Sequence, residues 1–559
     1  MTLSYVHGVS SRPLIGETVG GLFDRIAADH ADNDALIVSH QQIRWTYREL
    51  SDRVERFAAG LIALGLEPGE RIGIWAPNSA EWIVTQFATA KAGLILVNIN
   101  PAYRLGELEY ALTKAACRAL ILAPQFKTSN YHAMLAELAP EIAASPPGKL
   151  NAGRLPDLRY AITLADAAPP GFMSYAEISA RADDMTRQKL AAVAAGLQFD
   201  DPINIQFTSG TTGLPKAATL THHNIVNNAY FSGLRMQLSS ADRLCIPVPM
   251  YHCFGMVLGT LTCVAHGAAM VLPSPGYEAG AALRAIDEER CTAIHGVPTM
   301  FIAELDHPDF ANFNLATLRT GIIAGAPCPI ELMKRIIGDM HLEDITIAYG
   351  MTETGPVSFQ TSTSDSIEHK VATVGTVLPH TEVKIVDEHG KIVPTGTPGE
   401  LLTRGYCVMP GYWGDVEKTA ATIDASHWLH SGDSAVLNEA GYCRIVGRLK
   451  DMLIRGGENI FPREIEEYLF QHPLVEAAEV IGVPDEKYGE EVCAWIKLHD
   501  GEIASEEDIR EFCRDKIAHF KIPRYILFVD EFPMTITGKV QKFKMREQSI
   551  EKLGLEQSS

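Results

Sequence analysis

Residues 205–216 read Ile-Gln-Phe-Thr-Ser-Gly-Thr-Thr-Gly-Leu-Pro-Lys, the stretch that narrows the fold and function of this chain furthest. Its apolar start, Ile205–Phe207, predicts a buried strand. The strand runs into a turn where glycines leave backbone N–H groups open to an anion, while hydroxyls and a lysine add donors and positive charge. The residues of this turn are Thr208, Ser209, Gly210, Thr211, Thr212, Gly213 and Lys216. We therefore expect a polyphosphate-binding loop at the end of a strand.

The spacing separates this loop from the GxxxxGK[ST] phosphate loop. Lys216 follows Gly213 by three positions, and neither Ser nor Thr comes next. A turn of glycines, hydroxyls and one lysine is by itself more often an ordinary loop than a phosphate site. The twelve residues in their order are a far more specific signal.

Bulk properties restrict the class of protein. A chain of 559 residues exceeds what one hydrophobic core supports, so two or more domains are expected. The formal net charge of −21 argues against nucleic acid or an anionic membrane as partner. Ten scattered cysteines without a CxxC pair suggest neither a zinc site nor a disulfide framework, and reduced thiols in a cytoplasmic protein fit best. The N-terminus shows no secretory signal.

One long apolar stretch, residues 254–272, approaches the length of a membrane span and has His266 as its only ionisable group. Three glycines interrupt it, and prolines at 273 and 275 close it without basic flanks. We expect a buried helix followed by a buried strand, and no transmembrane segment.

Helix and strand signals alternate from Thr46 onward. Thr46 and Glu49 form a capping box before apolar residues at helical spacing. Strands are predicted at 71–75 and 94–98, a helix at 80–92, similar alternation over 245–350, and surface loops at 145–155 and 361–370. Such alternation predicts an α/β fold, with a large N-terminal domain of helix-covered, mostly parallel sheets.

A change of pattern near Gly447–Asp451 predicts a domain boundary. Beyond it the signals are those of a compact α+β unit of about 110 residues. They predict helices at 462–470 and 505–517 and strands at 478–483, 492–498 and 525–529. We divide the chain into a large domain, residues 1–447, a hinge, 448–451, and a small mobile C-terminal domain, 452–559.

The end of the small domain is locally basic. Arg514 to Arg546 contains eight Lys or Arg against three Asp or Glu. In an acidic protein this concentration suggests a surface that faces phosphates, and a solvated charged face is the alternative.

Seven further segments carry residue types suited to nucleotide or acyl chemistry. They are Tyr251–Gly255 (YHCFG), 325–327 (GAP), Tyr349–Thr354 (YGMTET), 431–433 (SGD), Gly447–Asp451 (GRLKD), Arg455–Glu466 (RGGENIFPREIE) and Pro533–Lys539 (PMTITGK). Together with the 205–216 string, and in this order, they resemble the AMP-forming adenylating enzymes, which include acyl-CoA synthetases, luciferases and peptide-synthetase adenylation domains. The resemblance covers roughly residues 20–550 and is strongest to medium-chain fatty-acid–CoA ligases.

For the nucleotide, the resemblance implies a site built from several loops. Tyr349 would pack against adenine, and Thr352 would touch the α-phosphate. Asp433 would bind the ribose hydroxyls, which suits a carboxylate with two acceptor oxygens, and Arg448 would also reach the ribose. The other ATP- or AMP-binding positions are residues 208–213, Lys216, Gly325, Ala326, Pro327, Gly350, Met351 and Lys539.

The resemblance also assigns a metal and the catalytic groups. Glu353 would bind Mg²⁺, for which one carboxylate together with substrate phosphates is sufficient. Standing alone, the Thr352–Glu353 pair would be read as a helix cap. The implied catalytic residues are Thr208, Lys216, Glu353 and Lys539.

The resemblance further assigns four residues to the binding of CoA, the binding of the acid and the movement of the small domain. Gly456 and Gly457 would line the channel for the pantetheine arm of CoA, and Lys450 would be the hinge residue. His252 would line the entrance to the acyl pocket, with a packing histidine as an equally weighted alternative.

The implied reaction joins a carboxylic acid, most like a medium-chain fatty acid, to CoA through acyl-AMP, with ATP, Mg²⁺ and CoA required and AMP and pyrophosphate released. The alternatives are an acyl-AMP ligase that loads a carrier protein, a luciferase-like oxygenase and a non-catalytic nucleotide-binding relative. The expected partners are small molecules, and a homodimer is left open.

Overall fold

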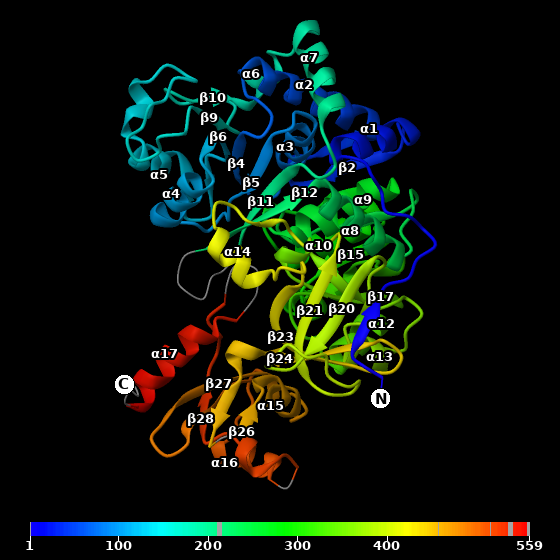
Figure 1. Ribbon diagram of the computed structural model, residues 1–559, viewed down its shortest axis with the longest axis vertical. Helices are drawn as coiled ribbons and strands as arrows, with labels where there is room; N and C mark the ends of the chain where they lie inside the picture. Colours follow the sequence, from blue (N-terminus) through cyan, green and yellow to red (C-terminus); the bar gives the residue numbers. More distant parts are fainter. Residues whose placement is uncertain (1, 209–214, 457, 515, 535–539, 556–559) are drawn as a thin grey trace.

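The computed structural model describes residues 2–208, 215–456, 458–514, 516–534 and 540–555. These residues form a large N-terminal domain around three β-sheets and a small C-terminal domain around a fourth, drawn in orange and red in Figure 1. The predicted fold class, a helix-covered α/β domain followed by a smaller α+β domain, is confirmed.

The first sheet contains the two strands that flank the predicted phosphate-binding segment, residues 208–216. It has eight strands in the order β10-β9-β6-β4-β5-β11-β12-β22, parallel from β10 to β11 and antiparallel at β12 and β22. Strand β5 is buried throughout, as expected of a sheet with helices on both faces. The strands are β4 Arg71–Trp75, β5 Ile95–Asn98, β6 Cys117–Leu122, β9 Tyr160–Thr163, β10 Met173–Ser174, β11 Pro202–Thr208, β12 Lys216–Thr221 and β22 Gly411–Tyr412.

The second sheet has nine strands in the order β19-β18-β17-β16-β15-β13-β14-β2-β3. It is parallel from β17 to β2, so β16 and β17 end at the same edge. The strands are β2 Asp34–Val38, β3 Ile43–Thr46, β13 Arg243–Cys245, β14 Ala269–Leu272, β15 Ala293–Gly296, β16 Thr320–Ala324, β17 Asp344–Gly350, β18 Val357–Gln360 and β19 Thr376–Val377.

The third sheet is antiparallel and leads into the small domain. Its order is β1-β20-β21-β23-β24, with strands β1 Tyr5–His7, β20 Thr381–Val386, β21 Gly399–Gly405, β23 Leu429–Leu437 and β24 Cys443–Arg448. A short 3₁₀ turn, Leu449–Asp451, separates β24 from the first strand of the small domain. The hinge predicted at 448–451 includes this turn, and the domain limits stay a prediction.

Helices cover the sheets of the large domain (Figure 1). The predicted capping box at Thr46 and Glu49 is present and begins α2. The helices are α1 Val19–Asp29, α2 Tyr47–Ala63, α3 Ala80–Lys91, α4 Leu105–Lys114, α5 Tyr131–Leu138, α6 Tyr175–Ser179, α7 Asp184–Gly196, α8 His222–Arg235, α9 Thr262–His266, α10 Ala279–Glu289, α11 Pro298–Leu305, α12 Ile330–Asp339, α13 Ile367–Ala372 and α14 Val416–Thr422. A two-stranded ribbon, β7 Gln125–Phe126 and β8 Ser129–Asn130, completes the domain.

The small domain packs three helices on one sheet. Its strands follow the order β26-β25-β28-β27, and β29 pairs with β28. The elements are β25 Leu453–Arg455, β26 Glu458–Ile460, α15 Pro462–Leu469, β27 Val475–Asp485, β28 Gly489–Leu498, α16 Glu506–Cys513, β29 Tyr525–Phe528 and α17 Lys542–Leu553.

The apolar stretch 254–272 is a buried helix followed by a buried strand, as predicted. Phe254–Leu261 is wound as a π-helix, α9 continues it, and β14 follows. Across the described segments, no helix is long and apolar enough to cross a bilayer.

Two predictions of local structure were wrong. Residues 361–370 are not simply a surface loop, because Ser366 caps α13 and Lys370 is buried, its ammonium donating to the Glu343 carbonyl at 3.1 Å. Helix α16 ends at Cys513 rather than near 517, because Arg514 takes an extended conformation. Residues 145–155 do lack regular structure, although Leu150 is buried.

Candidate active site

The residues on either side of segment 209–214 belong to two antiparallel neighbours of the first sheet. Strand β11 ends at Thr208, β12 begins at Lys216, and these two residues are paired across the ladder. This register places a hydroxyl-bearing residue beside a lysine at the ends of the two strands. The predictions for Ser209, Gly210, Thr211, Thr212 and Gly213 fall outside the described residues.

Glu353 is brought to the same place by the second sheet. It follows β17 in a short 3₁₀ turn, Thr352–Thr354, and is only 4% exposed. Its Oε1 accepts a hydrogen bond from the Thr208 hydroxyl at 3.4 Å and lies 3.7 Å from Lys216 Nζ. The structure thus brings Glu353 of the 349–354 motif to Thr208 and Lys216 of the 205–216 motif.

A fourth member of this cluster, Tyr412, was missed by the sequence analysis. Its hydroxyl donates to Glu353 Oε1 at 2.8 Å and accepts from Lys216 Nζ at 2.7 Å. Burial, followed by the charge of Glu353, raises the pKa of Tyr412, so the phenol stays a donor at neutral pH. Tyr412 lies on β22, and the short sequence Gly411-Tyr-Trp413 is the only local feature that could have pointed to it. Strand β22 pairs with β12 so that Tyr412 is opposite Ala218, two residues from Lys216.

A second cluster surrounds Asp433. The Tyr349 hydroxyl donates to Asp433 Oδ2 at 2.5 Å, and Arg448 Nε lies 3.4 Å from Oδ1. Asp433 on β23 is paired directly with Arg448 on β24. Burial raises the pKa of Asp433, and the Arg448 charge opposes that rise. A largely buried carboxylate thus lies between a phenol and a guanidinium, with Tyr349 only four residues before Glu353.

Two glycines of the predicted nucleotide loops occupy positions that a side chain would disturb. A Cβ on Gly350 would lie 1.8 Å from the Pro356 carbonyl oxygen, so no other residue fits without moving the backbone. Gly325 has φ +88°, in the left-handed region. Gly325, Ala326 and Pro327 are exposed where β16 ends, and Met351 leads into the Glu353 turn.

The aromatic motif lies against the nucleotide motif. Cys253 Sγ is 3.7 Å from the Thr352 hydroxyl, which joins segment 251–255 to the turn that carries Glu353. His252 accepts the Phe254 backbone N–H on Nδ1 at 3.1 Å. This bond fixes the imidazole at the start of the π-helix and fits either a pocket-lining or a packing role.

The residues predicted for the small domain are partly described. Lys450 is exposed in the turn that follows Arg448. Gly456 has φ +60°, and a Cβ there would lie 3.1 Å from the Tyr488 ring. Gly457 and Lys539 fall outside the described residues.

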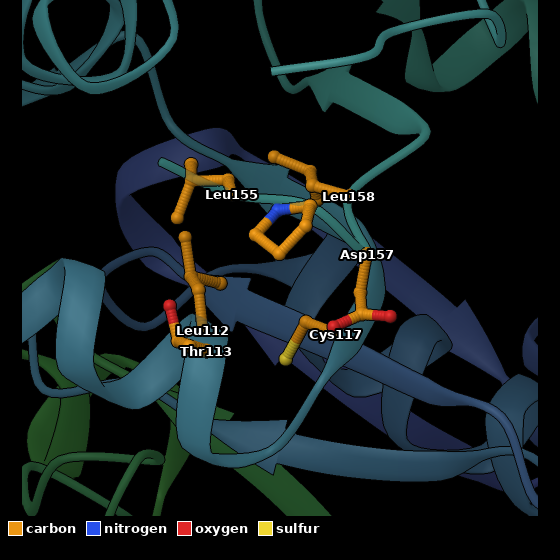
Figure 2. A pocket seen from close by; sticks show the side chains of 7 residues that line it. Leu112, Thr113, Cys117, Leu155, Asp157 and Leu158 are labelled. Carbon is orange, nitrogen blue, oxygen red and sulfur yellow. The ribbon is translucent and has the colours of Figure 1, made fainter. Parts of the chain in front are cut away.

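A surface depression elsewhere on the first sheet is unrelated to these clusters. It lies between the end of α4, the start of β6 and residues 155–158, and is lined mainly by leucines and Cys117 (Figure 2). Cys117 is the first residue of β6, and β6, β4, β5 and β11 are parallel. The depression therefore lies at the edge of the sheet opposite Thr208.

The fold and the two clusters define a nucleotide-binding α/β enzyme with a second, smaller domain. Residues 23–413 match the AMP-binding enzyme family, and residues 464–539 match the C-terminal domain of AMP-binding enzymes. The chain belongs to the AMP-binding enzyme family, which confirms the family predicted from the motifs.

Relatives extend along the whole chain. It is 49% identical to the medium-chain acyl-CoA ligase ACSF2, mitochondrial, of Danio rerio, over 99% of this chain and 92% of that protein. It is 47% identical to the Homo sapiens protein of the same name, over 99% and 91%. Its identity to the putative acyl-CoA synthetase YngI of Bacillus subtilis is 48%, over 98% and 99%.

Solved structures share the architecture. The anthranilate CoA ligase AuaEII in complex with anthranoyl-AMP superposes with a TM-score of 0.85 at 28% identity, covering 97% of this chain and 99% of that one. ATP-bound MatB from Rhodopseudomonas palustris gives a TM-score of 0.80 at 27% identity, covering 95% and 99%.

Proposed function

We propose that this protein is an ATP-dependent acid–thiol ligase that joins a medium-chain fatty acid to CoA through an acyl-AMP intermediate. The observation that carries the proposal is the gathering of Lys216, Glu353 and Tyr412 at the end of β11. Glu353 of this cluster follows Tyr349 of the Tyr349–Asp433 pair by four residues. Full-length relatives named as medium-chain acyl-CoA ligases support the choice of acid.

In the first half-reaction a carboxylate oxygen of the acid attacks the α-phosphorus of ATP, and pyrophosphate leaves. The groups involved are anionic, so the protein mainly positions them and neutralises charge. Thr208 and Lys216, which are paired directly on neighbouring strands, would hold the β- and γ-phosphates. Asp433 and Arg448 would orient the ribose, and Lys539 would bridge the attacking carboxylate and the α-phosphate.

Glu353 fits a role in holding Mg²⁺ with the phosphates of ATP. Its carboxylate is a hard oxygen donor, and the Thr208 hydroxyl lies within 3.4 Å of it. Among the residues that the structure describes, no three His, Cys, Asp or Glu side chains form a metal cage. Magnesium is usually bound by one or two carboxylates together with substrate phosphates, where it neutralises phosphate charge.

In the second half-reaction the thiol of CoA attacks the acyl carbon of acyl-AMP, and AMP leaves. The small domain would turn about Lys450, withdraw Lys539 and bring Gly456 and Gly457 to the site, a hinge motion of a known kind. His252 would then lie at the entrance of the acyl pocket.

We also propose that the protein acts in the cytoplasm on small-molecule substrates. No disulfide links its ten cysteines, all of which lie in the described part of the chain. The relatives from Danio rerio and Homo sapiens are named as mitochondrial, so fractionation of the native host is the direct check.

The test is pyrophosphate release and acyl-CoA formation across straight-chain acids of increasing length, each with and without CoA. We expect acyl-CoA to form fastest with medium-length acids, and acyl-AMP to accumulate without CoA. Lys539→Ala should lower acyl-AMP formation about 10²–10³-fold and spare transfer from supplied acyl-AMP. Acyl-AMP formation without any thioester would favour the carrier-loading alternative, and no pyrophosphate release with any acid would contradict the proposal.

A further inference from the structure

A second lysine of the small domain lies in an unusual environment. Lys542 is the first residue of α17, three positions after the predicted catalytic Lys539. The positive end of the helix dipole disfavours a cation at a helix N-terminus. A lysine at this position does not stabilise its own helix, so its contacts with other elements must account for it.

Lys542 is surrounded by acceptors from two other elements. Its ammonium pairs with Glu466 of α15, lies 3.3 Å from Glu479 Oε2 on β27, and donates to the Val480 carbonyl at 3.1 Å. The Lys542 and Glu479 side chains are each 24% exposed, and that of Glu466 is 17% exposed. Glu466 is itself held, because it accepts the Val480 backbone N–H at 2.8 Å.

The cluster is held by attraction between the Lys542 ammonium and the carboxylates of Glu466 and Glu479. Burial, followed by the neighbouring Glu466, raises the pKa of Glu479 to about 7. The charges that face Lys542 come from Glu466, Glu479 and, from the hinge turn, Asp451, and they raise its pKa against the effect of burial. Without the ammonium, two carboxylates would face each other in a half-buried site.

The cluster lies directly beside the ends of the segment that carries Lys539. Gln541 N donates to the Pro533 carbonyl at 2.7 Å, and Met534 and Val540 form an antiparallel bridge. These contacts join the described residues on either side of segment 535–539, and the next residue after Gln541 is Lys542. The described residues that flank this segment are therefore tied to α15 through the Lys542 ammonium. They are tied to β27 through the same ammonium and, one turn further along α17, through Arg546, which donates to the Gly482 carbonyl at 2.6 Å.

We propose that Lys542 is a positioning residue that fixes the base of the Lys539 segment on the small domain and so sets the rate of acyl-AMP formation. The inference rests on the proposed function, in which Lys539 serves the adenylation step. The proposed thioester step depends on Gly456 and Gly457, which precede β26 and α15 in the sequence. Helix α15 keeps its own attachment to β27 through Glu466 and Val480. Loss of Lys542 should therefore affect the two half-reactions unequally.

The test compares Lys542→Met, Lys542→Arg and the double variant Lys542→Met/Glu479→Gln, which also removes one carboxylate so that no like-charged pair is left. Lys544→Met, at an exposed lysine of the same helix, is the matched control. Single-turnover acyl-AMP formation, the KM for ATP and transfer from supplied acyl-AMP to CoA are measured for each full-length protein.

Because a displacement of about 1 Å can cost about 10²-fold in rate, we expect Lys542→Met and the double variant to form acyl-AMP about 10- to 100-fold more slowly. The KM for ATP and the transfer rate should stay close to those of the wild type, Lys542→Arg should recover most of the rate, and Lys544→Met should match the wild type. Wild-type adenylation by the double variant, or an equal fall in both half-reactions, would overturn the inference. A wild-type protein that forms neither acyl-AMP nor acyl-CoA would instead contradict the proposed function.

Discussion

Lys216 Nζ and Glu353 Oε1 lie 3.7 Å apart, and the hydroxyl of Tyr412 forms a hydrogen bond with each of them. The ammonium donates to the phenol, and the phenol donates to the carboxylate. The residue expected to bind phosphate and the residue expected to bind the metal are thus held in one chain of hydrogen bonds.

Tyr412→Phe should lower the rate of acyl-AMP formation about tenfold or more, because a hydrogen bond to a charged group contributes about 1.5–3 kcal/mol. Pre-steady-state pyrophosphate release measures the effect. Tyr442→Phe removes a comparable hydroxyl–carboxylate bond, to Asp365 at 2.7 Å, away from the site and serves as control. Equal rates in the two variants would show that the Tyr412 hydroxyl does not support the site.

Glu353→Gln should raise the Mg²⁺ concentration needed for half-maximal turnover by roughly tenfold or more, because a neutral amide is a poorer ligand for a hard cation. A magnesium titration at saturating ATP measures it. Glu331→Gln changes an exposed carboxylate of α12 and should leave the titration unchanged. An unshifted curve for Glu353→Gln would remove Glu353 from the metal site.

Lys450→Pro should leave the pyrophosphate burst largely intact and block thioester formation, since proline fixes φ and a hinge must change its dihedral angles. Lys450→Ala removes the same side chain but keeps the backbone free, and it should transfer the acyl group normally. A proline variant with a normal burst and normal transfer would show that the chain does not turn at residue 450. Loss of both steps in Lys450→Pro alone would point to a disturbed Arg448.

Glu304→Gln should flatten the dependence of stability on pH. Glu304 is 1% exposed, and within the described residues neither carboxylate oxygen has a hydrogen-bond partner, so burial raises its pKa from 4.5 to about 8. The native state keeps a proton that the unfolded state loses above about pH 4.5, so this contribution to stability is full at lower pH. It declines by roughly 1 kcal/mol per pH unit as pH rises toward 8.

Thermal unfolding at pH 5.5 and 7.5 tests this sign. The wild type should lose stability between the two pH values, and Glu304→Gln should lose less. Glu331→Gln, which is exposed, should behave like the wild type. An unchanged slope in the Glu304 variant would mean that this carboxyl group is ionised in the native protein.

The sequence predicts the buried strands of the large domain well, because a strand covered on both faces is apolar along its whole length. The range 71–75 agrees with β4 residue for residue. Helix α13 was missed because the residues before it are rich in Ser, Thr and Asp, which are typical of loops. The buried Lys370 ammonium donates to a carbonyl 27 residues earlier, and no local sequence pattern reveals such a partner.

In the candidate site too, some residues could be predicted from local motifs and others could not. Tyr349, Glu353, Asp433 and Arg448 stand in motifs that can be read locally, and the structure pairs Tyr349 and Arg448 with Asp433. Tyr412 contacts residues 59 and 196 positions away, so only the assembled strands bring it to Glu353 and Lys216. The acyl pocket stays undetermined by sequence, because its shape depends on how many distant side chains pack.

The direct pairing of Asp433 with Arg448 limits how the length of this region can vary. The ladder has one irregularity, at Val446, and beyond it Asp433 and Arg448 are in register. Because side chains alternate between the two faces of a strand, one further residue inserted or deleted between Cys443 and Arg448 would turn the guanidinium away from the carboxylate. The turn at 438–441, closed by its own hydrogen bond from Gly441 N to the Asn438 carbonyl, lies outside the ladder and can change length without that effect. We therefore expect insertions and deletions among relatives to occur in this turn and to be absent from the six residues of β24.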